Sequence, residues 1–344
     1  MFPVRPFFAM TARITGVFSF GRFPTPVERV AAFSSPDCSL WVKRDDLTHD
    51  VYGGNKVRKL EHVLAAARAV GARRLVTLGA AGSHHVLATT YFGARAGFQV
   101  EAVIVPQPRS DHAVEVLRAS LALGLIAFPV RSWAAAPIAL AARAARGARF
   151  VGLGGSSVAG SMGYVAAARE LASQVRNGVM PEPDVCVVAL GSGGTAAGLS
   201  AGFAAEGMKT RVIGVCVATP ILVVRSVALT LAWACARRVG VRAPLASMRA
   251  RMEVDARFLG RGYGYSTAEA ERAMDAARDG AGLTLDPTYT AKTFAAALAH
   301  ARAGRHRVVL YWHTLSSAPM RPLLSGAPSE GDLAPSLRAL WAAP

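Results

Sequence analysis

An alternation of short apolar runs with helical periods, from about residue 56 onward, is the feature of this chain that most restricts its fold. The apolar runs predict strands at 74–78, 100–105, 127–130, 185–190, 212–217 and 308–311. The stretches between and after them predict helices at 57–70, 85–96, 113–123, 135–145, 164–175, 196–205, 267–278 and 291–302. Strands that alternate with helices form a parallel sheet covered by helices. The sequence therefore predicts an α/β protein.

The length of the chain and one connector indicate two domains. A chain of 344 residues, of which 52% are hydrophobic and 18% charged, can bury a large core, and its length favours two domains over one. Residues 177–184 include Gly178, Pro181 and Pro183 and form the clearest connector. We predict a domain boundary near this segment.

The formal net charge of +17 raises the question of a nucleic-acid partner, because clustered basic side chains neutralise phosphates. The arginines are scattered through alanine-rich helical stretches, however, and no run interleaves aromatic with basic residues. This distribution favours a compositional bias, so we predict no nucleic-acid partner and keep that class as a distant alternative. The charge does predict electrostatic attraction for small anionic substrates.

The four cysteines, Cys38, Cys186, Cys216 and Cys235, form no CxxC pair and have no metal-ligand spacing. They predict reduced, buried thiols in a reducing compartment, and no metal site.

Two apolar segments could indicate export or a membrane. Residues 1–23 lack acidic residues, but arginines interrupt the apolar runs and no long apolar region precedes a cleavage site. Residues 212–236 are interrupted by Pro220 and Arg225, which predicts a buried strand followed by a helix rather than a membrane span. We therefore predict a cytoplasmic protein without a membrane partner, with Met10 as a second candidate start.

Lys56 is the first candidate for chemistry. It lies in Gly53-Gly54-Asn55-Lys56-Val57-Arg58-Lys59, at the glycine-flanked start of a predicted helix, where a lysine can hold an aldehyde cofactor as a Schiff base. Lysines are few, and Lys209 and Lys292 lack glycine-rich neighbours that would let a cofactor approach the backbone. The alternative is a solvated residue at a helix start.

Three strand-to-helix junctions could bind anions. The run Gly191-Ser192-Gly193-Gly194-Thr195 follows a predicted strand, so its backbone N–H groups and the positive end of the next helix could hold a phosphate. It lacks the Gly-Lys-Ser ending of a P-loop and the spacing of a dinucleotide fingerprint. The second junction carries Ser83, which is placed either to cap a helix or to bind a substrate carboxylate. The third is Gly154-Gly155-Ser156-Ser157. For each, an ordinary turn is the alternative.

A candidate Schiff-base lysine and a phosphate loop that is not nucleotide-like occur in one chain. Pyridoxal 5′-phosphate (PLP) requires both an amine and a phosphate cradle, so it is the cofactor that explains both features.

Three longer motifs extend this argument to a family. They are Lys43-Arg44-Asp45-Asp46-Leu47-Thr48, the run GGNKVRKLE at 53–61, and GGSS at 154–157 followed by Gly163-Tyr164-Val165. Together they resemble the D-cysteine desulfhydrase and 1-aminocyclopropane-1-carboxylate (ACC) deaminase family, which has the tryptophan synthase β-like fold of PLP enzymes. The resemblance covers roughly residues 23–319. It implies a large PLP-binding domain of residues 1–60 and 168–344, a smaller inserted α/β domain of residues 61–167, and a homodimer.

The resemblance also implies roles for individual residues. Lys56 corresponds to the Schiff-base lysine, and Ser83, Tyr263 and Tyr289 to the other catalytic residues. The implied cofactor-binding residues are Lys56, Asn55, His84, Gly191, Ser192, Gly193, Gly194, Thr195, Thr290 and Thr314. The implied substrate-binding residues are Ser83, His84, His85, Gly154, Ser156 and Tyr289.

Several positions help to choose a reaction within the family. Where ACC deaminases have a glutamate that meets the pyridine nitrogen, this chain has Thr290, and Thr314 matches the desulfhydrase threonine. A neutral partner makes the ring a weaker electron sink, which suits loss of a thiolate better than opening of a cyclopropane. Two departures reshape the pocket: His84 replaces the family asparagine, and Leu315-Ser316 replaces a glycine pair.

The resulting hypothesis is a PLP-dependent lyase that converts a small amino acid, D-cysteine first, into pyruvate, sulfide and ammonia. One alternative is an ACC deaminase that yields 2-oxobutanoate and ammonia. A second is a PLP-binding family member whose catalysis is lost or altered, which the departures at His84 and Leu315 favour.

Overall fold

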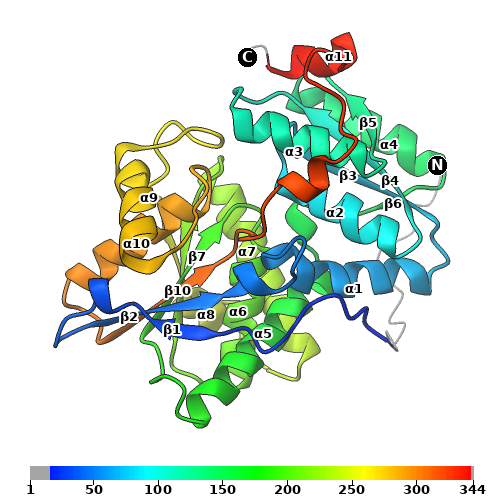
Figure 1. Ribbon diagram of the computed structural model, residues 1–344. Helices are drawn as coiled ribbons and strands as arrows, with labels where there is room; N and C mark the ends of the chain where they lie inside the picture. Colours follow the sequence, from blue (N-terminus) through cyan, green and yellow to red (C-terminus); the bar gives the residue numbers. More distant parts are fainter. Residues whose placement is uncertain (1–15, 342–344) are drawn as a thin grey trace.

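The computed structural model describes residues 16–341, which form two separate β-sheets covered by helices (Figure 1). All six predicted strands and eight predicted helices are present, with some ends shifted. The prediction of an α/β protein with parallel sheets is therefore confirmed. The second candidate start, Met10, lies outside the described residues.

The larger sheet has six strands in the order β1-β2-β10-β7-β8-β9. Neighbouring strands are parallel except β1 and β2, which are antiparallel. The strands are β1 (Val27–Arg29), β2 (Ser39–Arg44), β7 (Val185–Leu190), β8 (Arg211–Cys216), β9 (Met252–Asp255) and β10 (Val308–His313).

Helices cover both faces of this sheet because its central strands are apolar on both sides. On one face α9 (Ala268–Ala281) and α10 (Thr290–Arg302) pack through residues such as Phe294 against Val187 and Val309. On the other, α5 (Val158–Arg176) and α6 (Gly194–Ala205) pack through Leu199 against Val188. Outside α6 lie α7 (Ile221–Arg238) and α8 (Leu245–Arg251).

The smaller sheet has four parallel strands in the order β5-β4-β3-β6. Its strands are β3 (Arg74–Ala80), β4 (Gln99–Val105), β5 (Ile126–Pro129) and β6 (Arg149–Phe150). One face packs against α1 (Asn55–Ala69), α2 (His84–Arg95) and α3 (Asp111–Ala122), and the other against α4 (Ala136–Ala145). Alternate residues of β4 accordingly enter the two hydrophobic clusters.

The C-terminal segment returns to the smaller sheet. It comprises η5 (Arg321–Leu324), α11 (Pro335–Arg338) and η6 (Ala339–Trp341), and Figure 1 shows it in red beside α3. Leu323, Leu333, Leu337 and Leu340 join the cluster formed by α1, α2 and α3. The predicted domain boundaries stay a prediction, and this segment, which the sequence assigned to the large domain, packs with the small sheet.

The remaining sequence expectations concern thiols and membranes. All four cysteines are buried and free, and residues 212–236 form β8 followed by α7, as predicted. Within residues 16–341, no helix is both long enough and apolar enough to span a bilayer. The same part of the chain contains no group of three or more His, Cys, Asp or Glu side chains that could hold a metal ion.

Candidate active site

Lys56 lies in the first turn of α1, and the end of β10 fixes that turn. The Asn55 amide donates to the Thr314 carbonyl at 3.0 Å. Gly54, the residue before α1, has φ +89°, and a Cβ there would lie 2.6 Å from the same carbonyl oxygen. Only glycine fits this close approach. The glycine pair of the sequence motif therefore serves to bring Lys56 up to the carboxyl end of the larger sheet.

The Lys56 amine has an environment suited to a nucleophile. Its Nζ donates to Asn55 Oδ1 at 2.8 Å, and the side chain is half-buried. Burial lowers the pKa of Lys56 to about 8, although the Asp286 carboxylate acts in the opposite direction. The uncharged form, which nucleophilic attack requires, is therefore much more abundant near neutral pH than in an ordinary lysine.

The glycine loop between β7 and α6 lies beside Lys56. Asn55 joins the two, because its Nδ2 lies 3.4 Å from Thr195 Oγ1 while its Oδ1 accepts from Lys56. Gly193, with φ +87°, is the N-cap of α6 and has no side chain to cap that helix. The Gly194 amide donates to Ser156 Oγ, so the positive end of α6 and the other N–H groups of its first turn are the part of the loop that an anion could use.

Ser156 connects the third junction to this loop. Its hydroxyl accepts from the Gly194 amide at 3.0 Å and lies 2.7 Å from Ser192 Oγ. The sequence assigned Ser156 and Gly154 to the substrate, but the structure brings Ser156 to the predicted phosphate loop. A contact of either residue with a substrate stays a prediction.

Lys59 is a functional candidate that the sequence did not identify. It is only 2% exposed, and its Nζ lies 3.2 Å from the Gly154 carbonyl and 3.4 Å from Ser156 Oγ. Burial, with a smaller effect from Lys56, lowers its pKa well below the ordinary lysine value. An anion at the glycine loop would compensate this buried amine. The signal in the sequence was its spacing, because Lys59 lies one helical turn after Lys56.

The residues present fit PLP. An amine of lowered pKa, a helix start whose N-cap is a glycine and a buried lysine converge on one region. These are the groups that an aldehyde and a phosphate on the same molecule require.

The two predicted tyrosines lie together near the glycine loop. Their rings are 5.6 Å apart, edge to face, and a Cβ at Gly191 would lie 3.1 Å from the Tyr289 ring. Tyr263 also packs against the hydrophobic cluster between the smaller sheet and α4. Burial raises the pKa of both phenols, so both stay protonated at neutral pH. The site therefore includes contacts from both sheets.

Asp286 is a second residue that the sequence did not identify. Its buried carboxylate accepts from the amides of Thr288, Tyr289 and Thr290 at 2.9, 2.7 and 3.1 Å, which organises the start of α10. It also accepts from the Thr290 hydroxyl at 2.6 Å. Because that hydroxyl is committed to Asp286, a contact of Thr290 with the cofactor stays a prediction. The signal was an aspartate five residues before a predicted helix.

In the Leu315-Ser316 pair, which replaces the glycine pair of the family, Ser316 has a structural role. The Ser316 hydroxyl accepts from the Gly53 amide at 2.9 Å, so it holds the glycine turn that precedes Lys56. Thr314 lies next to this turn and is 9% exposed.

Ser83, His84 and His85 lie where α2 begins. Ser83 is the N-cap of α2 and accepts from the Val86 amide at 3.4 Å, which confirms its predicted capping position. His84 contacts Tyr52 and His112. The ring nitrogens of His85 lie near Thr77 and Thr89, inside the small-sheet unit. A contact of His85 with a substrate stays a prediction.

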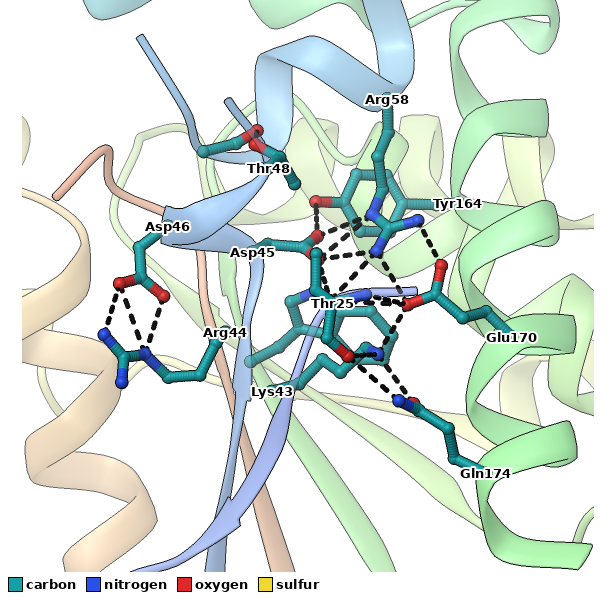
Figure 2. Close-up of polar contacts among 12 residues, drawn as sticks. Thr25, Lys43, Arg44, Asp45, Asp46, Thr48, Arg58, Tyr164, Glu170 and Gln174 are labelled. Atoms are coloured by element: carbon teal, nitrogen blue, oxygen red, sulfur yellow. Dashed lines mark hydrogen bonds and ion pairs between the residues drawn. The ribbon is translucent and has the colours of Figure 1, made fainter. Parts of the chain in front are cut away.

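A buried ion network supports the start of α1 from behind (Figure 2). Arg58 Nη2 lies 2.8 Å from Asp45 Oδ1, and Arg58 Nη1 lies 2.9 Å from Glu170 Oε2. Lys43 Nζ lies 2.5 Å from Glu170 Oε1. The two positive charges of Lys43 and Arg58 therefore offset the two negative charges of Asp45 and Glu170. Burial alone would raise the pKa of Asp45, but the adjacent Arg58 guanidinium holds it below its ordinary value. Thus the charged sequence motifs around residues 43–46 and 56–59 meet in space.

The chain is similar in sequence and in fold to several known proteins. Residues 18–314 match the family model described as pyridoxal-phosphate dependent enzyme. The nocardicin C-9′ epimerase of Nocardia uniformis subsp. tsuyamanensis is 33% identical over 300 residues, which cover 84% of this chain and 90% of that protein. The D-cysteine desulfhydrase of Klebsiella pneumoniae (strain 342) is 33% identical over 286 residues, covering 79% of this chain and 84% of that protein. A crystal structure of an ACC deaminase homologue superposes with a TM-score of 0.77 at 28% identity, covering 90% of this chain and 96% of that one.

Proposed function

The chain belongs to the pyridoxal-phosphate dependent enzyme family, and from this premise we propose that it is a lyase that eliminates a β-substituent from a small amino acid, D-cysteine first. The products would be pyruvate, sulfide and ammonia. The observation that carries the proposal is the bridge formed by Asn55, whose side chain joins the Lys56 amine to the phosphate loop at Thr195.

The residues that would hold PLP follow from the site. Lys56 would attach the aldehyde, and the start of α6 with Lys59 would hold the phosphate. When bound, PLP supplies an electron sink that weakens the bonds at the substrate Cα.

The remaining steps belong to side chains of this chain. With its pKa lowered to about 8, Lys56 Nζ can accept the proton from Cα. Ser83 Oγ and the start of α2 would orient the substrate carboxylate. Tyr263 and Tyr289 remain protonated, so either hydroxyl can donate a hydrogen bond to a departing thiolate.

Elimination from D-cysteine is favoured over ACC deamination because position 290 carries a neutral threonine whose hydroxyl is engaged by Asp286. The similar D-cysteine desulfhydrase supports the same choice. The test supplies purified, PLP-loaded protein with D-cysteine, L-cysteine and ACC, and measures sulfide, pyruvate and 2-oxobutanoate. Sulfide and pyruvate from D-cysteine, absent in Lys56→Ala, would support the proposal. Formation of 2-oxobutanoate from ACC alone would replace it, and no turnover of any β-substituted amino acid would favour altered catalysis.

Epimerisation is a second candidate, favoured by the similarity to nocardicin C-9′ epimerase. An epimerase removes the Cα proton on one side and returns a proton on the other, so it requires a proton donor besides Lys56. His84 and its partners offer one. Incubating the protein in D₂O with D- and L-amino acids would test this candidate. Inversion with deuterium at Cα but no keto acid would favour it over elimination.

Three coarser expectations are also proposed here. They are a homodimer, a division into residues 1–60 with 168–344 and residues 61–167, and a cytoplasmic location. Light scattering coupled to gel filtration tests the dimer, and limited proteolysis tests the boundaries. Cell fractionation tests the location.

A further inference from the structure

A line of three side chains runs from the buried Tyr52 beside the start of α1 to the surface. Tyr52 is 2% exposed, and its hydroxyl lies 2.6 Å from His84 Nδ1. His84 Nε2 lies 2.7 Å from His112 Nε2, and His112 is exposed at the start of α3. The contacts are continuous, and both nitrogens of His84 take part in them.

We propose that Tyr52, His84 and His112 form a proton relay between the active site and solvent, with His112 as its exposed end. The use of this relay in turnover rests on the proposed lyase activity. Its hydrogen-bonded arrangement does not.

The position of the line links it to Lys56. Tyr52 precedes the glycine turn that ends at Lys56, and His84 follows Ser83 at the start of α2. The charged and titratable groups that act on His84 come from four places: Tyr52, Lys56, His112 and Asp286. Asp286 also acts on Tyr52 and on Lys56, so one buried carboxylate influences the relay and the catalytic amine.

The relay has two arrangements that conserve every proton. In the first, the Tyr52 hydroxyl donates to His84 Nδ1, and His84 Nε2–H donates to His112 Nε2. In the second, His84 Nδ1–H donates to the Tyr52 oxygen, and His112 Nε2–H donates to His84 Nε2. The Tyr52 hydroxyl then donates to the His84 carbonyl, which lies 3.3 Å away.

Conversion of the first arrangement into the second exports one proton. The Tyr52 proton moves to His84 Nδ1, and the His84 Nε2 proton moves to His112 Nε2. His112 releases its Nδ1 proton to water, while the Tyr52 oxygen takes a replacement proton from the bound amino acid. The reverse sequence imports a proton. Every step breaks one bond to hydrogen and forms another, so no oxidant or further reactant is required.

Neutrality of the central imidazole makes these exchanges possible. Burial lowers the pKa of His84 to about 3, helped by His112 and Lys56 and opposed by Asp286. A neutral imidazole has one donor and one acceptor nitrogen, whereas an imidazolium has two donors and cannot accept from Tyr52.

The test uses the PLP-loaded protein with ¹⁵N-labelled histidine and three variants. His112→Gln removes the exposed end, Tyr52→Phe removes the inner hydroxyl while keeping the ring, and His306→Gln is a control at a histidine outside the line. Nuclear magnetic resonance follows the His84 ring nitrogens through the pH range in which histidine titrates. The turnover of D-cysteine is measured in parallel at increasing imidazole concentration.

A relay predicts that the His84 signals shift with pH and that His112→Gln abolishes this shift, whereas His306→Gln does not. His112→Gln should also lower kcat roughly 10-fold, with recovery as imidazole is added, because a small base can replace an exposed proton acceptor. Tyr52→Phe should lower kcat without recovery, because added imidazole cannot reach the buried end.

The relay is overturned if the pH response of the His84 signals is the same in the wild-type protein and in His112→Gln, or if the His112→Gln defect is insensitive to imidazole. If the wild-type protein shows no turnover with any substrate, the proposed lyase activity fails. The resonance measurement then still decides whether the three groups are coupled.

Discussion

The pKa of Lys56 results from two opposing effects of its surroundings. Protein atoms around its Nζ destabilise the ammonium form, while Asp286 partly restores that form, and the pKa falls from 10.5 to about 8. The unfolded chain therefore binds more protons than the folded chain between about pH 8 and 10.5. The stability of the cofactor-free protein accordingly rises with pH across this window.

The same pKa predicts the pH dependence of cofactor attachment. Only the uncharged amine attacks an aldehyde, so the rate of PLP uptake should increase up to about pH 8 and then level off. The measurement is the absorbance of PLP mixed with cofactor-free protein at a series of pH values, with Lys56→Ala as the control that gains no covalent cofactor. A midpoint near the ordinary lysine value of 10.5 would contradict the environment described for Lys56.

The residues that the sequence predicted differ in kind from those it missed. Lys56 and the loop at 191–195 were predictable because local features mark them, namely flanking glycines and a strand-to-helix turn. Lys59 and Asp286 were missed because their roles depend on burial and on contacts across the fold. His112 could not be linked to His84, because α2 and β4 separate them along the chain and only packing of α3 brings their rings together.

At the scale of elements, the position of α1 depends on groups that lie behind it. Arg58 follows Lys56 by two residues and contacts Asp45, at the end of β2, and Glu170, on α5. Tyr164 and Trp312 complete the site by donating to Asp45 Oδ2, each at 2.7 Å. Removing the guanidinium would leave two carboxylates facing only Lys43.

Arg58→Ala should therefore lower the free energy of unfolding by roughly 3–5 kcal/mol, the typical cost of breaking a buried ion pair from one side. Urea unfolding of the cofactor-free protein measures this change. Arg278→Ala is the matched control, because Arg278 pairs with Asp275 and Asp279 on the surface, where water screens the pairs, and should change the free energy of unfolding much less. Similar losses in the two variants would show that the network does not hold α1.

The glycine at the start of α6 allows a second comparison between elements. Gly193 and Gly178 both have left-handed backbones, with φ +87° and +75°. A Cβ at Gly193 would lie 3.0 Å from Ala228 Cα on α7, whereas a Cβ at Gly178 would have no atom within 4 Å. Both positions bear the cost of a left-handed side chain, about 1–2 kcal/mol, but only Gly193 has a helix against it.

Gly193→Ala should therefore displace the phosphate loop, and Gly178→Ala should not. We expect Gly193→Ala to weaken PLP binding by at least roughly 10-fold, equivalent to about 1.4 kcal/mol. Fluorescence titration of cofactor-free protein with PLP provides the comparison. Unchanged affinity in Gly193→Ala would argue against this loop as the phosphate site.

The elements missed from the sequence share a physical reason. β2 includes Lys43, which can be buried because the Thr25 carbonyl, Glu170 and Gln174 accept hydrogen bonds from its amine. β1 and β9 are short strands at the edges of the larger sheet. Such strands lack a continuous apolar run, so their pairing depends on neighbours that are distant in sequence.

For the whole molecule, the site draws on groups from both sheets. Lys56 lies in the first turn of α1, which packs on the smaller sheet, while the predicted phosphate loop at 191–195 follows β7 of the larger sheet. Tyr263 contacts Tyr289 beside the glycine loop and also the cluster between the smaller sheet and α4. The C-terminal segment adds a further connection, because it continues from β10 and packs beside α3. A cofactor held at this place would contact elements of both sheets.

PLP should accordingly stabilise the molecule as a whole. Part of this stabilisation should come from the phosphate and should be measurable separately from the covalent bond to Lys56. A ligand at about 100 times its Kd stabilises by roughly 2.7 kcal/mol through mass action alone. We expect PLP to raise the Tm of the wild-type protein in a concentration-dependent way. Pyridoxal, which keeps the aldehyde but lacks the phosphate, should raise the Tm less.

In Lys56→Ala the covalent contribution disappears, while the phosphate contribution from α6 and Lys59 remains. PLP should therefore still raise the Tm of this variant more than pyridoxal does. Differential scanning calorimetry of both proteins with both ligands measures the two contributions. Equal stabilisation by PLP and pyridoxal would show that the loop at 191–195 does not bind the phosphate. The structural argument for placing the cofactor at this loop would then fail.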